Sequence, residues 1–303
     1  MTAALAEGGV WAADGAKAVA VHQGTAPALQ FTPTKNFTYT TMPLRQLFAQ
    51  VVAAAAGQGG PWLYLRAVGS RPRKDSADLW RDFPQLSTAL SWRVFQPWVP
   101  PAAYFSSVLR IMAPGMALWT HYDVRDNILL QLHGTKTVTL FPLAAAQGVQ
   151  LAGSTSTLHG DTQAPPVEHL RNTLWRGSVP EAARAWGHLT AAAASTGAVA
   201  VTLHPGDALF IPSCVPHAVS VPSDSPASVG VNVFWHDPRL PRTATRGKDV
   251  YGNHDADKVA AARRVAAECV AKACAELPPD YAAFYAGVVS EDVRRGGVAG
   301  CGT

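Results

Sequence analysis

The chain has 303 residues, of which 48% are hydrophobic and 15% are charged, so it can bury the core of one large domain or two small ones. Its formal charge of +4 and its pI of about 8.9 are mildly basic, which is compatible with an anionic partner but does not establish one. No apolar run is long enough to cross a membrane, so a membrane-spanning role is excluded.

The four cysteines show no CxxC spacing, and the first residues lack the features of a secretory signal. This pattern is typical of free thiols in a reducing compartment, so we expect a cytoplasmic protein.

The N-terminal part, residues 1–60, is expected to be helical or irregular, because its first half is rich in Ala and Gly and has weak periodicity. Residues 42–56 predict a helix that Gly57 ends. Residues 62–68 predict a strand, and residues 75–83 predict a short helix.

The middle of the chain consists of short runs of β-branched and aromatic residues separated by turn residues. The predicted strands are 106–112, 117–122, 127–132, 137–141, 198–203, 208–211, 217–221 and 230–235. Strands 127–132 and 137–141 are predicted to form a hairpin around the turn 133–136. An Ala-, Gly-, Ser- and Thr-rich region, 144–197, interrupts the series, with helical pieces expected near 166–186.

The C-terminal part returns to helical periodicity. Residues 255–276 predict a helix with Asp255 as its N-cap, and a second helix is predicted from Pro278 to about Val289. A β-rich centre with flanking helices indicates a mainly β fold, either a sandwich or a double-sheet jelly roll.

One histidine and one aspartate stand two positions apart on a strand-like stretch, so their side chains can point to the same side. They are His121 and Asp123, and His217 follows at the start of a later strand. Two imidazoles and one carboxylate are the ligand set of non-haem Fe(II) oxygenases, in which the metal keeps open positions. A histidine in a strand is more often a satisfied core residue, and catalytic zinc accepts the same ligands, so the spacing alone leaves these alternatives open.

The segments that surround these residues resemble the JmjC-type cupin dioxygenases. The stretches that carry the resemblance are WTHYDVRDNILLQLHGTKTVTLFP (119–142), PGDALFIPSCVPHAVS (205–220) and GVNVFW (230–235). The segments 64–86, 104–123 and 249–286 resemble more specifically the tRNA wybutosine hydroxylases within that family. The resemblance covers residues 35 to 289; region 144–197 is diverged, and we expect part of the family's N-terminal segment to be absent.

The resemblance implies a double-stranded β-helix (cupin jelly roll) core with C-terminal helices. It divides the chain into an N-terminal segment (1–60), a JmjC core with an insertion near 144–197 (61–236) and a C-terminal helical region (237–303). It also implies Fe(II) as the metal, with 2-oxoglutarate as cosubstrate and O₂ as oxidant.

The family's functional residues can be placed individually on this sequence. His121, Asp123 and His217 match the iron ligands. The residues that match the 2-oxoglutarate contacts are Tyr64, Asn127, Lys136 and Asn232. The residue types suit this task, because the buried far carboxylate of a dianion needs a cation and hydrogen bonds. Without the resemblance, Tyr64 would be interpreted as a core aromatic, Asn127 as a polar residue that begins a strand, and Lys136 as a solvated lysine in a hairpin.

The implied reaction is hydroxylation of wybutosine in the anticodon loop of phenylalanine tRNA, coupled to decarboxylation of 2-oxoglutarate to succinate and CO₂. Two basic segments without acids, 66–74 and 239–248, are candidates for phosphate contacts. The candidates for base stacking are Trp80, Trp92, Trp98 and Trp175. In each case the plainer interpretation is a solvated loop or a core tryptophan.

Two other functions share much of this pattern. A JmjC protein hydroxylase would use the same metal and cosubstrate on a protein side chain, and a non-catalytic cupin module would only bind a ligand. The apolar face of helix 255–276 is equally compatible with a homodimer surface and with packing inside the chain.

Overall fold

The computed structural model describes residues 1–30, 35–57, 60–71, 74–141, 151–152, 155–159, 199–236 and 257–300. The chain divides into two compact units, Met1–His254 and Asp255–Thr303. The domain boundaries at 60 and 236 stay a prediction, and the helical pieces expected near 166–186 lie outside the described residues.

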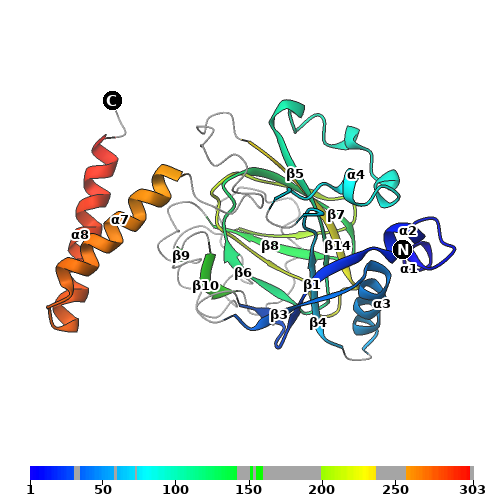
Figure 1. The fold of residues 1–303 in the computed structure, drawn as a ribbon, viewed down its shortest axis with the longest axis horizontal. Helices are drawn as coiled ribbons and strands as arrows, with labels where there is room; N and C mark the ends of the chain where they lie inside the picture. Colours follow the sequence, from blue (N-terminus) through cyan, green and yellow to red (C-terminus); the bar gives the residue numbers. More distant parts are fainter. Residues whose placement is uncertain are drawn as a thin grey trace. The chain divides into compact units, whose positions relative to one another are not determined.

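The first unit contains two large sheets of short strands (Figure 1). In spatial order, the first sheet consists of β12 (Ala208–Ile211), β7 (Asp126–His133), β14 (Ser228–Trp235), β5 (Tyr104–Met112), β4 (Trp62–Arg66), β1 (Ala18–Gly24) and β3 (Phe37–Pro43). The second sheet consists of β11 (Val199–Leu203), β8 (Lys136–Leu140), β13 (His217–Ser220), β6 (Ala117–His121), β10 (Thr155–His159) and β9 (Leu151–Ala152), with β2 (Ala28–Leu29) parallel to β6. The predicted fold class, a mainly β jelly roll with flanking helices, is confirmed.

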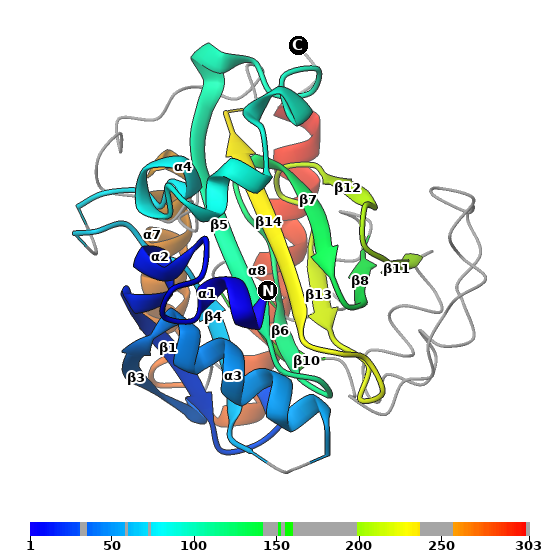
Figure 2. The same ribbon diagram turned by 90° about the vertical axis from the view of Figure 1, so that its right-hand side faces the viewer.

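A helix covers the outer face of the first sheet at strands β1 and β3. Helix α3 (Leu44–Ala55) carries an apolar stripe at helical spacing, formed by Leu44, Leu47, Phe48 and Val51. The helix contacts β1 and β3, and Figure 2 shows it with the short helices α1 (Thr2–Leu5) and α2 (Ala12–Ala16) on one side of this sheet. The other face of the sheet is therefore free to line the interior of the jelly roll.

The predicted hairpin between residues 127–132 and 137–141 is wrong. Strand β7 pairs with β12 and β14, whereas β8 pairs with β11 and β13 in the other sheet. The intervening turn passes from one sheet to the other, and the Gln131 side-chain amide donates to the carbonyls of His133 and Gly134 and to Ser228 Oγ. These contacts hold the turn against Ser228, the first residue of β14.

The N-terminal part contains strands that the sequence pattern did not predict. Residues 18–24 form β1 and residues 37–43 form β3, and both belong to the first sheet. Val19 and Val21 are buried between exposed alanines, an alternation that Ala-rich composition hides. The helix 42–56 is confirmed as α3 with small shifts at its ends.

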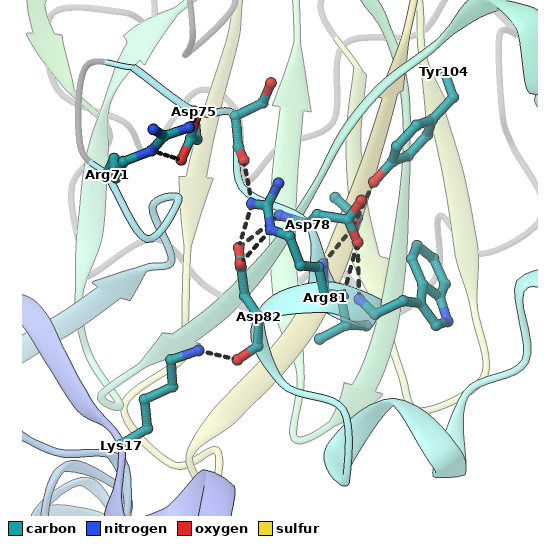
Figure 3. Close-up of polar contacts among 11 residues, drawn as sticks. Lys17, Arg71, Asp75, Asp78, Arg81, Asp82 and Tyr104 are labelled. Atoms are coloured by element: carbon teal, nitrogen blue, oxygen red, sulfur yellow. Dashed lines mark hydrogen bonds and ion pairs between the residues drawn. The ribbon is translucent and has the colours of Figure 1, made fainter.

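The predicted helix 75–83 is reduced to α4 (Leu79–Asp82), followed by the 3₁₀ turns η1 (Leu86–Ala89), η2 (Trp92–Val94) and η3 (Pro101–Ala103). Asp78 caps α4 by accepting from the amides of Trp80 and Arg81 (Figure 3). Arg81 donates to Asp82 and to the Ser76 carbonyl, and the Lys17 ammonium donates to the Asp82 carbonyl. This polar network attaches the segment between β4 and β5 to the N-terminal helices.

The second unit consists of helices α7 (Asp257–Cys274) and α8 (Pro279–Gly300), so the second predicted helix is longer than expected. Helix α8 exposes several large apolar side chains, namely Tyr281, Phe284, Tyr285, Val288, Val289 and Val293. The homodimer stays a prediction. Among the described residues, no helix has the length and hydropathy of a membrane span.

Candidate metal centre

Three potential metal ligands converge where two neighbouring strands meet. His121 ends β6, His217 begins β13, and the two residues are register partners in the antiparallel pair. Asp123 follows β6 by two residues. One ligand atom from each of the three side chains lies within 4.8 Å of the others, and the imidazole ring centroids are 4.4 Å apart. The predicted convergence of these residues from distant parts of the chain is therefore present in the structure.

Both imidazoles are oriented by backbone carbonyls. His121 Nδ1 donates to the Trp119 carbonyl at 3.0 Å, and His217 Nδ1 donates to the Val215 carbonyl at 2.9 Å. Each ring therefore keeps its Nε2 lone pair, which is the arrangement that fixes a metal-ligating histidine. Loss of hydration, and then the neighbouring His217, lowers the pKa of His121 to about 3, and burial also lowers the pKa of His217. Both rings are therefore neutral at physiological pH.

The loop that carries Asp123 is joined to the loop that precedes His217. Cys214 N donates to the Asp123 carbonyl at 2.7 Å, and Asp123 is only 5% exposed. Cys214 has a φ of +64°, a left-handed conformation that costs about 1–2 kcal/mol for a residue other than glycine. This local strain is retained at the point where the two ligand-bearing loops meet.

A cavity extends from the three ligands between the two sheets. Its polar lining beyond the ligands consists of Tyr64 on β4, Arg110 on β5, Lys136 on β8 and Asn232 on β14. Its apolar lining consists of Met112, Leu118, Leu129, Ile211 and Val219. The structure thus brings three of the four predicted 2-oxoglutarate contacts, Tyr64, Lys136 and Asn232, into one cavity with the metal ligands.

Lys136 is a cation placed almost entirely out of water, with 2% of its surface exposed. Burial, followed by repulsion from Arg110, lowers its pKa to about 7. Within the described parts of the chain, no acidic side chain forms an ion pair with it. A buried ammonium without a carboxylate is costly, so this position favours an anionic ligand.

Arg110 is a cavity residue that sequence reasoning missed. Its Nε donates to Asn232 Oδ1 at 2.7 Å, and its Nη1 donates to the Tyr64 hydroxyl. The available signal was a basic residue inside the apolar strand SSVLRIM, since charged residues are seldom enclosed unless they have a partner.

Asn127 is not among the residues that line the cavity, although it points to the same side of β7 as the lining residue Leu129. It is 1% exposed, and its Oδ1 accepts from Asn232 Nδ2 at 2.8 Å. Its Nδ2 donates to the Ile211 carbonyl at 3.4 Å. Asn127 thus holds Asn232, which in turn accepts a hydrogen bond from Arg110.

Comparison with known proteins identifies relatives of this chain. A family model for the cupin-like domain matches residues 12–239. The mouse (Mus musculus) protein named tRNA wybutosine-synthesizing protein 5 is 35% identical over 277 residues, covering 90% of this chain and 78% of the relative. The zebrafish (Danio rerio) protein of the same name is 36% identical over 281 residues, covering 90% of this chain and 75% of the relative.

The chain belongs to the tRNA wybutosine-synthesizing protein 5 family, within the cupin-like proteins. The resemblance that the sequence motifs indicated is therefore confirmed. The cupin-like domain model matches from residue 12 onward, so the matched region includes the N-terminal strands β1 and β3.

A longer fungal protein and a bacterial structure also resemble this member of the wybutosine-synthesizing family. A Neurospora crassa protein named tRNA wybutosine-synthesizing protein 4 is 31% identical over 280 residues, covering 91% of this chain and 20% of that protein. The crystal structure of Escherichia coli ribosomal oxygenase YcfD aligns with a TM-score of 0.39 and 12% identity, covering 78% of this chain and 45% of that one.

The predicted nucleic-acid contacts of this family member are only partly within the described structure. Segment 239–248, Arg73 and Trp175 lie outside the described residues. Arg71 is paired with Asp75 at 2.8 Å. Trp80 and Trp92 pack edge to face at 5.1 Å against the core, so they match the plainer interpretation, whereas Trp98 is 62% exposed.

Proposed function

We propose that this chain is an Fe(II)- and 2-oxoglutarate-dependent hydroxylase that acts on a wybutosine nucleoside in phenylalanine tRNA. The observation that carries the proposal is the convergence of His121, Asp123 and His217 with two cations, Lys136 and Arg110, in a single cavity. The names of the relatives supply the substrate, because they refer to wybutosine synthesis in tRNA.

The three ligands fit a divalent transition metal. Two neutral imidazoles with free Nε2 atoms and one carboxylate supply three donors, and this set suits non-haem iron when other coordination positions stay open. When bound, the iron supplies the redox chemistry that couples decarboxylation of 2-oxoglutarate and consumption of O₂ to hydroxylation of a C–H bond.

The cations of the cavity fit a dianionic cosubstrate. Lys136 and Arg110 lie on opposite sheets and line the same space, so an organic dianion between them would neutralise both. We assign the far carboxylate of 2-oxoglutarate to Lys136, with hydrogen bonds from Arg110 and the Tyr64 hydroxyl. Asn232 keeps Arg110 in position, and Asn127 keeps Asn232 in position.

The remaining lining orients the reaction and excludes water. Apolar side chains from both sheets, including Leu118, Leu129 and Ile211, surround the polar groups. They strengthen the interactions of the cations with the cosubstrate, because no water competes for them. No side chain of the cavity is needed as a general base. Hydroxylation of a tRNA nucleoside also implies a cytoplasmic location.

The proposal is tested by incubating the protein with Fe(II), 2-oxoglutarate, O₂ and phenylalanine tRNA that carries unhydroxylated wybutosine. Mass spectrometry of the nucleosides should show a gain of one oxygen atom, with succinate formed in equal amount. The Asp123→Ala variant should form neither product, whereas Asp224→Ala, which removes an exposed carboxylate, should match the wild type. Succinate formation with an unchanged nucleoside and a hydroxylated peptide would favour the protein-hydroxylase alternative.

A further inference from the structure

A row of aromatic side chains crosses the first sheet from its exposed edge to the cavity. Tyr39 on β3 is the register partner of His22 on β1, and His22 is the register partner of Tyr64 on β4. Partners in register point to the same face of a sheet. Because Tyr64 lines the cavity, the row faces the interior of the jelly roll and ends at the edge strand β3.

The rings of the row are in contact with one another. The centroid of His22 lies 4.8 Å from that of Tyr39 and 5.2 Å from that of Tyr64. His22 Nδ1 donates to the Tyr64 carbonyl at 3.3 Å. Burial, and then the nearby cations Arg66, Lys35 and Arg110, lowers the pKa of His22 to about 4, so it is a neutral aromatic ring at physiological pH.

A pair of stacked aromatic rings connects the outer end of this row to the second sheet. Phe37, two residues before Tyr39 on β3, is parallel to Trp119 on β6, with centroids 5.8 Å apart and an interplanar angle of 3°. Trp119 supplies the carbonyl that orients His121. The aromatic row is therefore joined directly to the strand that carries a proposed metal ligand.

The outer end of the row combines an exposed aromatic ring with a lysine that lies over it. Tyr39 is 59% exposed, which is unusual for a tyrosine whose neighbours are packed. The Lys35 ammonium lies over the Tyr39 ring at 4.4 Å and over the Phe37 ring at 4.8 Å. Lys35 forms no ion pair with any residue in the described ranges. The charges that act on His22 all come from basic residues, so this edge favours an anionic ligand.

We propose that Tyr39 and Lys35 form an RNA-binding platform, on which Tyr39 stacks a nucleobase of the substrate loop and Lys35 binds an adjacent phosphate. Stacking on an aromatic ring beside a cation is how proteins grip single-stranded nucleic acid. His22 supports the Tyr39 ring from within the sheet. This inference rests on the proposed function, because it assigns a contact surface to the tRNA substrate of the same cavity.

The test measures binding of the whole 303-residue chain, loaded with metal, to a fluorescent RNA hairpin with the sequence of the phenylalanine anticodon stem and loop. Anisotropy titrations at several salt concentrations give the dissociation constant and its salt dependence. Tyr39→Ala should weaken binding about tenfold, because one stacked base is lost, without changing the salt slope. Lys35→Ala should weaken binding and lower the slope of log K against log salt by about 0.7, the value for one phosphate of a single strand.

Two kinds of control variant show whether a loss of RNA binding comes from the proposed platform. Tyr39→Phe retains the ring and should bind like the wild type, which separates lost stacking from misfolding. Tyr281→Ala removes a tyrosine of similar exposure, 62%, and Lys272→Ala removes an exposed lysine, so both should leave binding unchanged. Photocrosslinking of the hairpin should place the attached nucleotide on the peptide that contains Tyr39.

The outcomes distinguish this inference from the proposed function. If the wild type binds the hairpin and Tyr39→Ala binds it equally well, the platform is overturned while the proposed function stands. A crosslink that maps only to other peptides would also overturn it. If the wild type does not bind the hairpin, the proposed tRNA function fails, and the platform fails with it.

Discussion

Lys136 should make the binding of 2-oxoglutarate depend on pH. Its pKa is lowered to about 7 by burial and then by Arg110, so near neutral pH about half of the free protein carries a charged lysine. A bound carboxylate favours the ammonium form. Above its pKa, binding of 2-oxoglutarate must therefore be accompanied by proton uptake at Lys136.

The dissociation constant of 2-oxoglutarate should accordingly rise as pH increases above about 7, by up to roughly tenfold per unit, and stay level below it. Isothermal titration calorimetry of the metal-loaded protein under anaerobic conditions measures this dependence. Lys136→Met should bind weakly and lose the pH step. A wild-type affinity that is constant from about pH 6 to about pH 9 would contradict the assigned role of Lys136.

Substitutions of Cys214 test the contact between the loop that carries Asp123 and the loop that precedes His217. Its φ of +64° suits glycine, so Cys214→Gly should change the free energy of unfolding by less than about 1 kcal/mol, because relieved strain offsets added chain entropy. Cys214→Val should destabilise by about 1–3 kcal/mol, since a β-branched residue tolerates this conformation poorly. Urea denaturation measures both values, and equal stability of the two variants would contradict this view.

Some residues of the site could be predicted from the sequence, and others could not. The spacing of His121 and Asp123, with His217 at the start of another apolar strand, predicted their convergence without any knowledge of strand order. Arg110 was missed, because its role depends on lying opposite Lys136 in the other sheet, and sheet membership depends on long-range pairing. Asn127 was predicted as a direct contact; it is a side-chain neighbour of Asn232, from which it accepts a hydrogen bond, and its contact with the cosubstrate stays a prediction.

At the scale of elements, the local composition predicted most of the strands but not how they connect. Strands β7 and β8 are adjacent in sequence and separated by a short turn, which is the usual pattern of a hairpin. The turn instead passes between sheets, held by Gln131 and by close contact with the segment before β14. Such contacts involve residues almost a hundred positions away and have no local signal.

Gly134 within this turn gives a specific prediction. It has a φ of +66°, and a Cβ at this position would lie 2.5 Å from the Ala227 carbonyl oxygen. Gly134→Ala should therefore destabilise by more than about 3 kcal/mol, since strain and a backbone clash add. Gly57→Ala is the matched control, because Gly57 has a φ of +76° with open space around it.

The control should cost only about 1 kcal/mol, the strain of the left-handed conformation alone. Thermal denaturation of both variants measures the difference. Equal losses would show that the turn does not pack against the residues before β14, and the crossing between sheets would then need another explanation.

At the scale of the whole molecule, the metal should stabilise one part of the chain. The proposed ligands join β6 and β13 of the second sheet and belong to the unit Met1–His254. A divalent ion at about 100 times its dissociation constant adds about 2.7 kcal/mol to stability. Hydrogen exchange should therefore slow in β6 and β13 when metal is added, while the amides of α7 and α8 should not respond.

Asp123→Ala should abolish this protection, and Asp224→Ala, which removes an exposed carboxylate, should retain it. Slower exchange that is spread equally over both units would contradict a metal site confined to the first. The same measurement needs no turnover, so it separates loss of the metal from loss of activity.

The most direct test of the central claim is an anaerobic titration of the protein with Fe(II) and 2-oxoglutarate, followed by visible absorption. Chelation of the iron by the keto acid should produce a charge-transfer band that requires both components. The band should be absent in His121→Ala and Asp123→Ala, and in Lys136→Met it should appear only at much higher 2-oxoglutarate concentration. A wild-type protein that binds Fe(II) but gives no band with 2-oxoglutarate would contradict the claim that these residues form an iron and keto-acid site.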